Sequence, residues 1–289
     1  MNSKVVLITG TNSGFGYVTV KTLAALGHRV YATMRDIQGR NADQANELSA
    51  IPNVSVLEVN LTDDNSVNNA IDTVIAKEST IDILINNAGF SMVGFAESFT
   101  VTDVQELFDI NVIAPWRLIK AILPAMRNQA DGLIINITSG FGRFSSPFST
   151  IYSATKFGLE GISEGLHYEL RPLGVDVAIV EPGPFPTGMM NNIRYGSDQS
   201  VTPAYEYFAE LPNKVGAAIG NLLQTVQPDP QEVADAINNL INLSKGQRPL
   251  RTVVDRATGE FVKAANDAVQ VQYEKGLRAF GMGDLLISQ

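Results

Sequence analysis

Tyr152 and Lys156, the ends of the run Tyr-Ser-Ala-Thr-Lys at 152–156, could transfer a proton. Residues four apart share one face of a helix, so the phenol and the ammonium group would be neighbours there. A free tyrosine titrates near pH ~10, which is too high for efficient proton transfer at neutral pH. A nearby ammonium favours the phenolate, so the pair predicts a tyrosine whose pKa is lowered. By itself the spacing is more typical of an ordinary surface helix. Other motifs in the chain are therefore needed to support a proton-transfer pair.

A glycine-rich turn follows the first apolar run. Residues 4–9 are typical of a buried parallel strand and residues 17–26 have a helical pattern, with Thr-Gly-Thr-Asn-Ser-Gly-Phe-Gly at 9–16 leading from one to the other. Glycines let the backbone approach a dinucleotide pyrophosphate, and the helix N-terminus offers free N–H groups. The spacing is Gly-x-x-x-Gly-x-Gly rather than the commoner Gly-x-Gly-x-x-Gly, and a turn without a ligand is the alternative.

The second strand, 29–34, ends at Met34 and is followed by Arg35 and Asp36. This strand end should lie beside the adenosine ribose, where an arginine suits the 2′-phosphate of NADP and a carboxylate suits the 2′-hydroxyl of NAD. Arg35 therefore predicts NADP(H), and the Ser13 hydroxyl could bind the same phosphate. Asp36 keeps NAD(H) as the alternative, and a solvated surface charge is the other interpretation of Arg35.

Strands and helices alternate along the rest of the chain. Strands are expected at 54–59, 81–85, 132–138, 174–180 and 250–254, and helices at 41–50, 64–78, 102–127, 151–171 and 230–243. This alternation predicts an α/β protein: a single-domain, doubly wound Rossmann fold with a parallel sheet of about seven strands and helices on both faces.

No linker or composition shift divides residues 1–289. Within one domain we expect a cofactor-binding and catalytic core at 1–188, a C-terminal substrate-binding lid at 189–227 and a completing segment at 228–289. Part of the segment 189–227 could equally form a helix at 204–223 that packs on the core. Residues 257–289 have no clear assignment.

Several polar residues follow the carboxyl ends of the expected strands, where ligands bind in open α/β sheets. Asn-Asn-Ala-Gly stands at 86–89, Ser139 ends the fifth strand, and Thr187 lies in a proline-rich loop after the sixth. Ser139 could bond a substrate oxygen, and Thr187 the amide of a nicotinamide. Asn111 interrupts the helix at 102–127 one turn before Pro115, which predicts a kink. Each also has a plain interpretation as a turn, cap or tolerated polar residue.

The composition excludes several classes of function. The chain has 289 residues, a formal net charge of −9, no cysteine and two histidines, His28 and His167. An acidic balance disfavours nucleic acid and anionic membranes as partners. Disulfides and thiolate metal sites are excluded, no metal site is expected, and no Gly-x-Ser-x-Gly elbow supports a serine hydrolase. With no signal-peptide core and no long apolar run, a cytoplasmic location is expected.

In combination these motifs resemble the short-chain dehydrogenase/reductase family over nearly the whole chain. The ordered motifs are Thr-Gly-x-x-x-Gly-x-Gly at 9–16, Asn-Asn-Ala-Gly at 86–89, Asn111, Ser139, Tyr-x-x-x-Lys at 152–156 and Pro-Gly at 182–183. Tyr-Ala-Thr-Met-Arg-Asp at 31–36 and Phe-Gly-Leu-Glu-Gly at 157–161 are most similar to hydroxysteroid and retinol dehydrogenase-type members or bacterial-type ketoreductases. Two positions depart from the family pattern. Asn60 stands where the family often has an aspartate near the adenine. Met34 stands where NAD-preferring members have the acid that binds the ribose, which favours NADP.

The resemblance implies roles for these residues. Tyr152 is the acid or base, Lys156 lowers its pKa and holds the nicotinamide ribose, Ser139 bonds the substrate oxygen, and Asn111 positions a water in a proton relay. The implied cofactor-binding residues are Gly10, Asn12, Ser13, Gly14, Phe15, Gly16, Arg35, Leu61, Asn87, Ala88, Gly89, Tyr152, Lys156, Pro182, Gly183, Phe185 and Thr187.

The expected substrate is a small-molecule ketone or aldehyde and its alcohol, interconverted by hydride transfer. The expected pocket is apolar and suits a bulky ketone, although Arg143 could bind an anion; its residues are Gly140, Phe141, Phe144, Phe148, Met189 and Met190. A catalytically silent NADP(H)-binding regulator is the alternative. The resemblance also implies a homodimer or homotetramer that pairs through the helices at 102–127 and 151–171.

Overall fold

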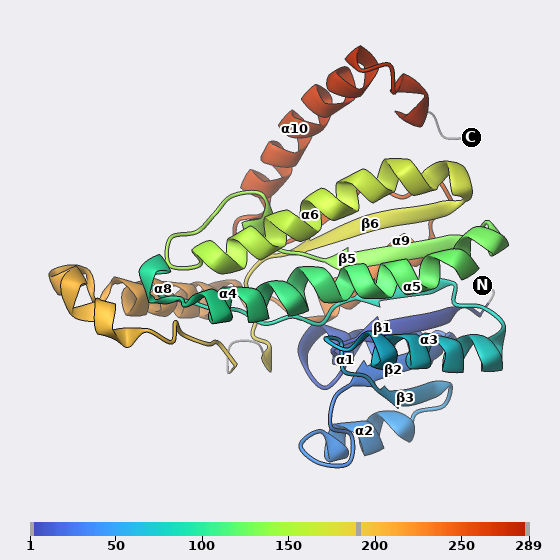
Figure 1. Cartoon of the computed structure of the whole chain (residues 1–289), viewed down its shortest axis with the longest axis horizontal. Coiled ribbons are helices and arrows are strands. Elements are labelled where there is room, and N and C mark those ends of the chain that lie inside the picture. The colour runs from blue at the N-terminus through green and yellow to red at the C-terminus, as the bar shows by residue number, and fades with distance from the viewer. Residues whose placement is uncertain (1–2, 189–191, 287–289) are drawn as a thin grey trace.

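The computed structural model describes residues 3–188 and 192–286 and contains one parallel sheet (Figure 1). In this described part the strands are β1 Val5–Thr9, β2 Arg29–Met34, β3 Val54–Glu58, β4 Ile83–Asn86, β5 Gly132–Ile137, β6 Val175–Pro182 and β7 Arg251–Val254. Their spatial order is β3-β2-β1-β4-β5-β6-β7, and every pair is parallel. The predicted seven-stranded, doubly wound sheet is confirmed.

The order of the strands reverses beside β1. The chain runs outward from β1 to β2 and β3, then returns to β4 on the other side of β1 and continues to β7. At such a switch point the loops that leave neighbouring strands diverge, which opens a crevice outside their carboxyl ends. The glycine-rich turn after β1 and the Asn-Asn-Ala-Gly turn after β4 flank this crevice.

Helices cover both faces because successive strand residues point to opposite sides. Val6 and Ile8 pack with α1 Gly14–Ala25, α2 Ala42–Ser49 and α9 Gln231–Asn242. Val5 and Leu7 pack with α3 Asp64–Glu78, α5 Ala114–Gln129 and α6 Thr150–Leu170. The strands are therefore mainly apolar, as expected for a sheet buried on both faces.

The helix expected at 102–127 is continuous, but it contains a π-helical turn at Asn111, where the sequence predicted a kink. It consists of α4 Val101–Phe108, a π-helical turn Asp109–Ile113, and α5. Thr100 and Asp103 form a capping box that starts α4. A π-helical turn leaves the regular hydrogen-bond pattern and is often found at functional sites.

The segment after β6 differs from the sequence-based expectation. The helix expected at 204–223 is a 3₁₀ segment, Gln199–Phe208, followed by α8 Leu211–Val226. Glu206 has a φ of 41°, which interrupts a helix there, and a proline stands in the first turn of α8. In Figure 1, α8 and the 3₁₀ segment extend beyond the body of the molecule on the side of α4.

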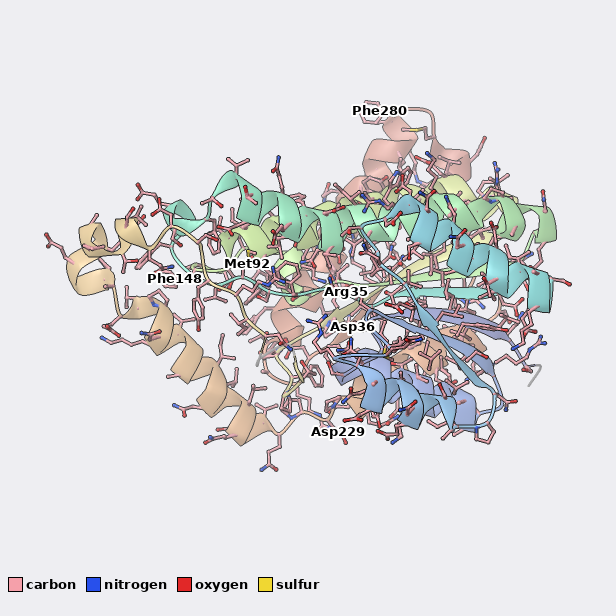
Figure 2. The ribbon with its side chains drawn as sticks, turned by 60° about the horizontal axis from the view of Figure 1, so that its bottom comes forward. Arg35, Asp36, Met92, Phe148, Asp229 and Phe280 are labelled. Carbon is pink, nitrogen blue, oxygen red and sulfur yellow. The ribbon has the colours of Figure 1, made fainter. Side chains whose placement is uncertain are left out.

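The C-terminal residues that the sequence left unassigned form α10 Gly259–Ala279, which projects outward past α6 (Figure 1). Phe280, directly after it, is 78% exposed at the edge of the molecule (Figure 2). The remaining short 3₁₀ turns described are Ala96–Ser98, Gly140–Gly142, Arg171–Leu173 and Gly283–Leu286.

Candidate active site

The glycine-rich turn forms a cradle that has no room for side chains. Gly10 and Gly14 have φ values of 68° and 58°, in the left-handed region that favours glycine. A Cβ on Gly10 would lie 2.8 Å from the Cα of Ala88, and one on Gly16 would lie 2.4 Å from the carbonyl oxygen of Gly10. The turn thus exposes backbone at the N-terminus of α1, where a pyrophosphate would bind.

Asn87 and Thr9 hold the turns after β1 and β4 together. The Thr9 hydroxyl accepts from the backbone N–H groups of Asn87 and Ala88, both at 3.0 Å. The Asn87 side chain donates to the carbonyls of Thr9 and Gly10 at 2.8 and 3.1 Å. Asn87 therefore shapes the cradle through its amide group.

The loop after β6 closes over the other side of the cradle. The Phe185 and Phe15 rings pack edge to face with 5.2 Å between their centroids. A Cβ on Gly14 would lie 3.3 Å from the Cβ of Thr187. Segments about 170 residues apart in the chain thus meet at one place, as a cofactor held from two sides requires.

One continuous cavity of about 1340 Å³ runs from the end of β2, past the cradle, to α8. It is lined by Tyr152, Lys156, Ser139 and most of the expected cofactor-binding residues: Gly10, Asn12, Ser13, Gly14, Phe15, Arg35, Leu61, Asn87, Ala88, Gly89, Pro182, Gly183, Phe185 and Thr187. Gly140, Phe141, Phe144 and Phe148 also line it. Its size and its glycine cradle fit a nicotinamide dinucleotide together with a second molecule.

Two of the expected site residues do not line the cavity. Gly16 lies beneath Gly10, and Asn111 lies behind the cavity wall, so neither lines the cavity. Met189 and Met190 lie outside the described residues.

Two arginines line this cavity near the end of β2, where the sequence predicted the adenosine ribose. Arg35, directly after β2, and Arg40, in the following turn, are both exposed and line it. Asp36 adjoins Arg35 (Figure 2), but its carboxylate accepts from the backbone N–H of Arg40 at 3.0 Å and closes the turn. It is not among the residues that line the cavity. Arg40 went unrecognised in the sequence because it lies six residues beyond the strand end.

Tyr152 and Ser139 lie together at the inner wall of the cavity. Ser139 follows β5, and its hydroxyl accepts from the N–H of Phe141 at 3.1 Å, so it also starts a 3₁₀ turn. The Tyr152 ring is 8% exposed and packs in one cluster with Met92 and Leu107. Burial raises the pKa of Tyr152 to about 12, and a side-chain hydrogen bond with Ser139 partly lowers it.

In the chain itself the pKa of Tyr152 is therefore raised by burial, and the expected lowering by Lys156 stays a prediction. The Lys156 ammonium lies 5.6 Å from the centroid of the Tyr152 ring and donates to the carbonyl of Ile137 at 3.0 Å. Burial of the phenol dominates in the chain itself. Burial also lowers the pKa of Lys156 to about 8, while the charge of Glu160 raises it.

Asn111 supports the site from the π-helical turn. Its side chain donates to the carbonyl of Phe90 at 3.0 Å and to the Thr155 hydroxyl at 3.1 Å, and accepts from the Phe90 N–H at 3.2 Å. A Cβ on Gly89 would lie 3.1 Å from Asn111 Oδ1 and 3.9 Å from Lys156 Nζ. The π-helical turn therefore brings Asn111 beside the lysine, and Gly89 leaves the space between them open.

The substrate end of the cavity has walls that the sequence did not reveal. Arg194 pairs with Glu106 at 3.1 Å and lies over the Phe90 ring, 4.4 Å from its centroid. Unrecognised apolar lining residues are Phe90, Val93, Ile193, Tyr195, Val215, Ile219 and Leu222. The helical spacing of Val215, Ile219 and Leu222 was a usable signal for one face of α8.

Arg143 does not line this cavity, which corrects its suggested role as an anion-binding group there. It faces inward, where its charge lowers the pKa of two buried acids, Glu160 and Glu181. The two histidines are also elsewhere: His28 Nδ1 accepts from the N–H of Lys4, and His167 contacts the carbonyl of Val177 at 2.7 Å.

Within the described residues, no group of three potential ligands among His, Asp and Glu could hold a metal ion. In the same part of the chain, no helix has the length and apolar character needed to span a membrane.

The chain is similar in sequence and fold to known proteins of one family. A family model for short chain dehydrogenases matches residues 4–198. A 3-ketodihydrosphingosine reductase from Bacteroides thetaiotaomicron is 34% identical over 242 residues, 79% of this chain and 86% of that protein. Human retinol dehydrogenase 8 is 32% identical over 86% of this chain and 80% of its own. A short-chain dehydrogenase structure from Streptomyces avermitilis superimposes with a TM-score of 0.76 at 30% identity, over 98% of both chains.

The family match covers the glycine cradle, Ser139, Tyr152 and Lys156, all of which face the same cavity. Members of this family act on CH–OH groups with a nicotinamide nucleotide, either NAD or NADP. The chain belongs to the short-chain dehydrogenase/reductase family and is an oxidoreductase.

Proposed function

We propose that this protein is an NADP(H)-dependent carbonyl reductase or alcohol dehydrogenase that interconverts a bulky apolar ketone or aldehyde and its alcohol. The observation that carries the proposal is the pair of hydroxyl-bearing side chains, Ser139 and Tyr152, which line one cavity together with Lys156. Two hydroxyl donors suit an oxygen that gains negative charge during reduction.

In this mechanism, the bound nicotinamide would supply the hydride or accept it. During reduction, the Tyr152 phenol donates its proton to the carbonyl oxygen, and Ser139 stabilises that oxygen by a hydrogen bond. The Lys156 ammonium, held by Ile137, offsets the negative charge that remains on the phenolate. In alcohol oxidation the phenolate removes the hydroxyl proton. We propose that Asn111, through its place beside Gly89 and Lys156, orients a water that resupplies the proton.

Support for an apolar substrate comes from the walls of the cavity. Phe141 and Phe144 pack edge to face, with 6.4 Å between their centroids, next to the Tyr152 ring. Residues 189–227 are proposed to act as the lid, since α8 presents Val215 and Ile219 to the cavity. Arg194 is paired with Glu106, so it is not a free cation for a charged substrate.

The substrate class is tested by following NADPH absorbance with a panel of ketones. We expect turnover of long-chain, steroid-like or aromatic ketones, because the apolar walls favour desolvation of such groups. Pyruvate-like small acids, matched in carbonyl reactivity, serve as the control. Activity restricted to those charged acids would contradict the proposed pocket. Turnover of the bulky ketones would also exclude the silent regulator.

The preference for NADP(H) is proposed to depend on Arg35 and Arg40. Replacing either with alanine is expected to raise the KM for NADPH by about 10–100-fold, because a charge-assisted hydrogen bond contributes roughly 1.5–3 kcal/mol. The KM for NADH should stay near its original value, as it has no 2′-phosphate. Arg127→Ala, an exposed arginine on α5, is the matched control. An equal rise in KM for NADPH and NADH would show that the arginines do not determine the preference for NADP(H).

A homodimer or homotetramer remains part of the proposal. Trp116 on α5 and Phe157 on α6 are 42% and 44% exposed, and Ile113 lies next to them in the π-helical turn. Such side chains on the two helices support pairing through this face. The cytoplasmic location expected from the sequence stays a prediction.

A further inference from the structure

Three consecutive residues at the end of β5 bond three residues of α6 that are spaced four apart. Ser139 interacts with Tyr152 and lowers its pKa, the carbonyl of Ile137 accepts from Lys156 at 3.0 Å, and the hydroxyl of Thr138 donates to Glu160 at 2.6 Å. Residues spaced in this way share one face of a helix. Glu160 is therefore the third member of a row that contains the two proposed proton-transfer residues.

The Glu160 carboxylate is buried and held on several sides. It is 2% exposed, and its second oxygen accepts from Arg251 Nε on β7 at 2.9 Å. The other end of the same guanidinium pairs with Glu164 at 2.5 Å. A Cβ on Gly142 would lie 2.8 Å from Glu160 Cγ, so the 3₁₀ turn after Ser139 packs directly on the glutamate.

Charged groups from every neighbouring element face Glu160. Lys156 and Glu164 come from α6, Arg143 follows the 3₁₀ turn, Glu181 ends β6, and Arg251 belongs to β7. Burial raises the pKa of Glu160, and Arg251 and the Thr138 hydroxyl lower it.

The second buried acid, Glu181, is held by a different contact. Burial raises its pKa to about 7, and its carboxylate accepts from Asn266 on α10 at 2.6 Å. Of the acids in this cluster, Glu160 is the one whose charge raises the pKa of Lys156.

We propose that Glu160 is a positioning residue for the Tyr152–Lys156 pair. Its carboxylate holds Thr138 and thereby the strand end that presents Ile137 and Ser139, and its negative charge compensates the burial of the Lys156 ammonium. Removing the carboxylate charge would make the buried ammonium less favourable and release the strand end. The inference rests on the proposed function, because it concerns the group that serves Tyr152 in that mechanism.

The electrostatic part is tested by titrating Lys156 in protein labelled with ¹³C at the lysine ε position, without nucleotide or substrate. In Glu160→Gln we expect the titration midpoint of Lys156 to fall by about one pH unit, as expected when an opposite charge within one helical turn is removed. Glu164→Gln is the matched control, because it also removes a carboxylate from Arg251. An unchanged midpoint in Glu160→Gln, or an equal fall in Glu164→Gln, would overturn the proposal.

The positional part is tested with Thr138→Val, which keeps the carboxylate and the shape of the side chain. We expect kcat to fall about 10-fold, since small misplacements of catalytic groups are costly. The Lys156 midpoint should remain that of the original protein, and Glu160→Asp should recover more activity than Glu160→Gln. Full activity in Thr138→Val would refute the positional role, even if Glu160→Gln proved too unstable to purify. If the titration midpoint of Lys156 falls in Glu160→Gln but the original protein turns over no carbonyl substrate, the proposed function alone is refuted.

Discussion

Replacing Tyr152 with phenylalanine is expected to lower kcat for carbonyl reduction by about 10²–10⁴-fold, the contribution of a positioned acid–base group. The ring would keep its packing against Met92 and Leu107, so the fold should persist. The lost hydroxyl is the proposed proton donor, and it lines the cavity together with Ser139. Steady-state kinetics with NADPH, together with nucleotide binding by fluorescence, measure the effect.

Tyr168→Phe is the matched control for this substitution. Tyr168 is a second buried tyrosine on α6, 4% exposed, whose hydroxyl accepts from Gln270 at 2.9 Å. Its loss should cost about 1 kcal/mol of stability, typical of one hydrogen bond, with little change in kcat. Retained turnover in Tyr152→Phe would refute the assignment of Tyr152 as the acid. Loss of nucleotide binding in that variant would show a general defect in the site instead.

Replacing Lys156 with methionine is expected to lower kcat by at least about 10²-fold. Methionine fits a buried, unbranched side chain, but it provides no charge for the phenolate and leaves the Ile137 carbonyl without its donor. Lys263→Met is the control, because Lys263 is exposed and pairs with Asp267 on the surface of α10. We expect that variant to keep full activity.

The same substitution predicts a change in pH dependence. The pKa of Lys156 is lowered to about 8, so its ammonium is present below that pH and is lost as pH rises through it. Tyr152, with a pKa of about 12, keeps its proton over this range. The rate of reduction should therefore fall above about pH 8 in the original protein, and this decline should be absent from the residual activity of Lys156→Met. An identical pH profile in both proteins would contradict a role for the Lys156 charge.

Much of the fold was predictable because its signals are local. Apolar runs of strand length, glycine turns and helical patterns recur in order, and a parallel sheet follows from that alternation. An irregularity at Asn111 was also predictable, since asparagine and proline both disfavour a regular helix, and it takes the form of a π-helical turn. In the segment 199–226 the helix expected at 204–223 begins later, at Leu211, because a backbone conformation such as that of Glu206 has no signature in composition. The long helix α10 lacked a clear pattern because much of its surface is exposed.

The sequence was enough to predict which residues form the site, but it did not show the surroundings of their side chains. Ordered motifs nominated Ser139, Tyr152 and Lys156 because the chemistry of proton transfer needs those groups at those strand and helix ends. The direction of the Tyr152 pKa depended instead on how completely packing removes the phenol from water. Whether Arg35, Arg40 or Asp36 faces the cavity was decided by one turn that occupies the Asp36 carboxylate.

The amino-acid sequence by itself thus determined the class of fold, the glycine cradle and the identity of the proton-transfer residues, since these depend on short-range patterns. The tertiary structure alone decided which groups surround them. It brought Thr138, Glu160 and Arg251 from β5, α6 and β7 into one buried cluster beside Lys156, and it turned Arg143 away from the cavity. Contacts between residues about 90 positions apart, such as Glu160 with Arg251, arise only when the sheet and its helices pack together.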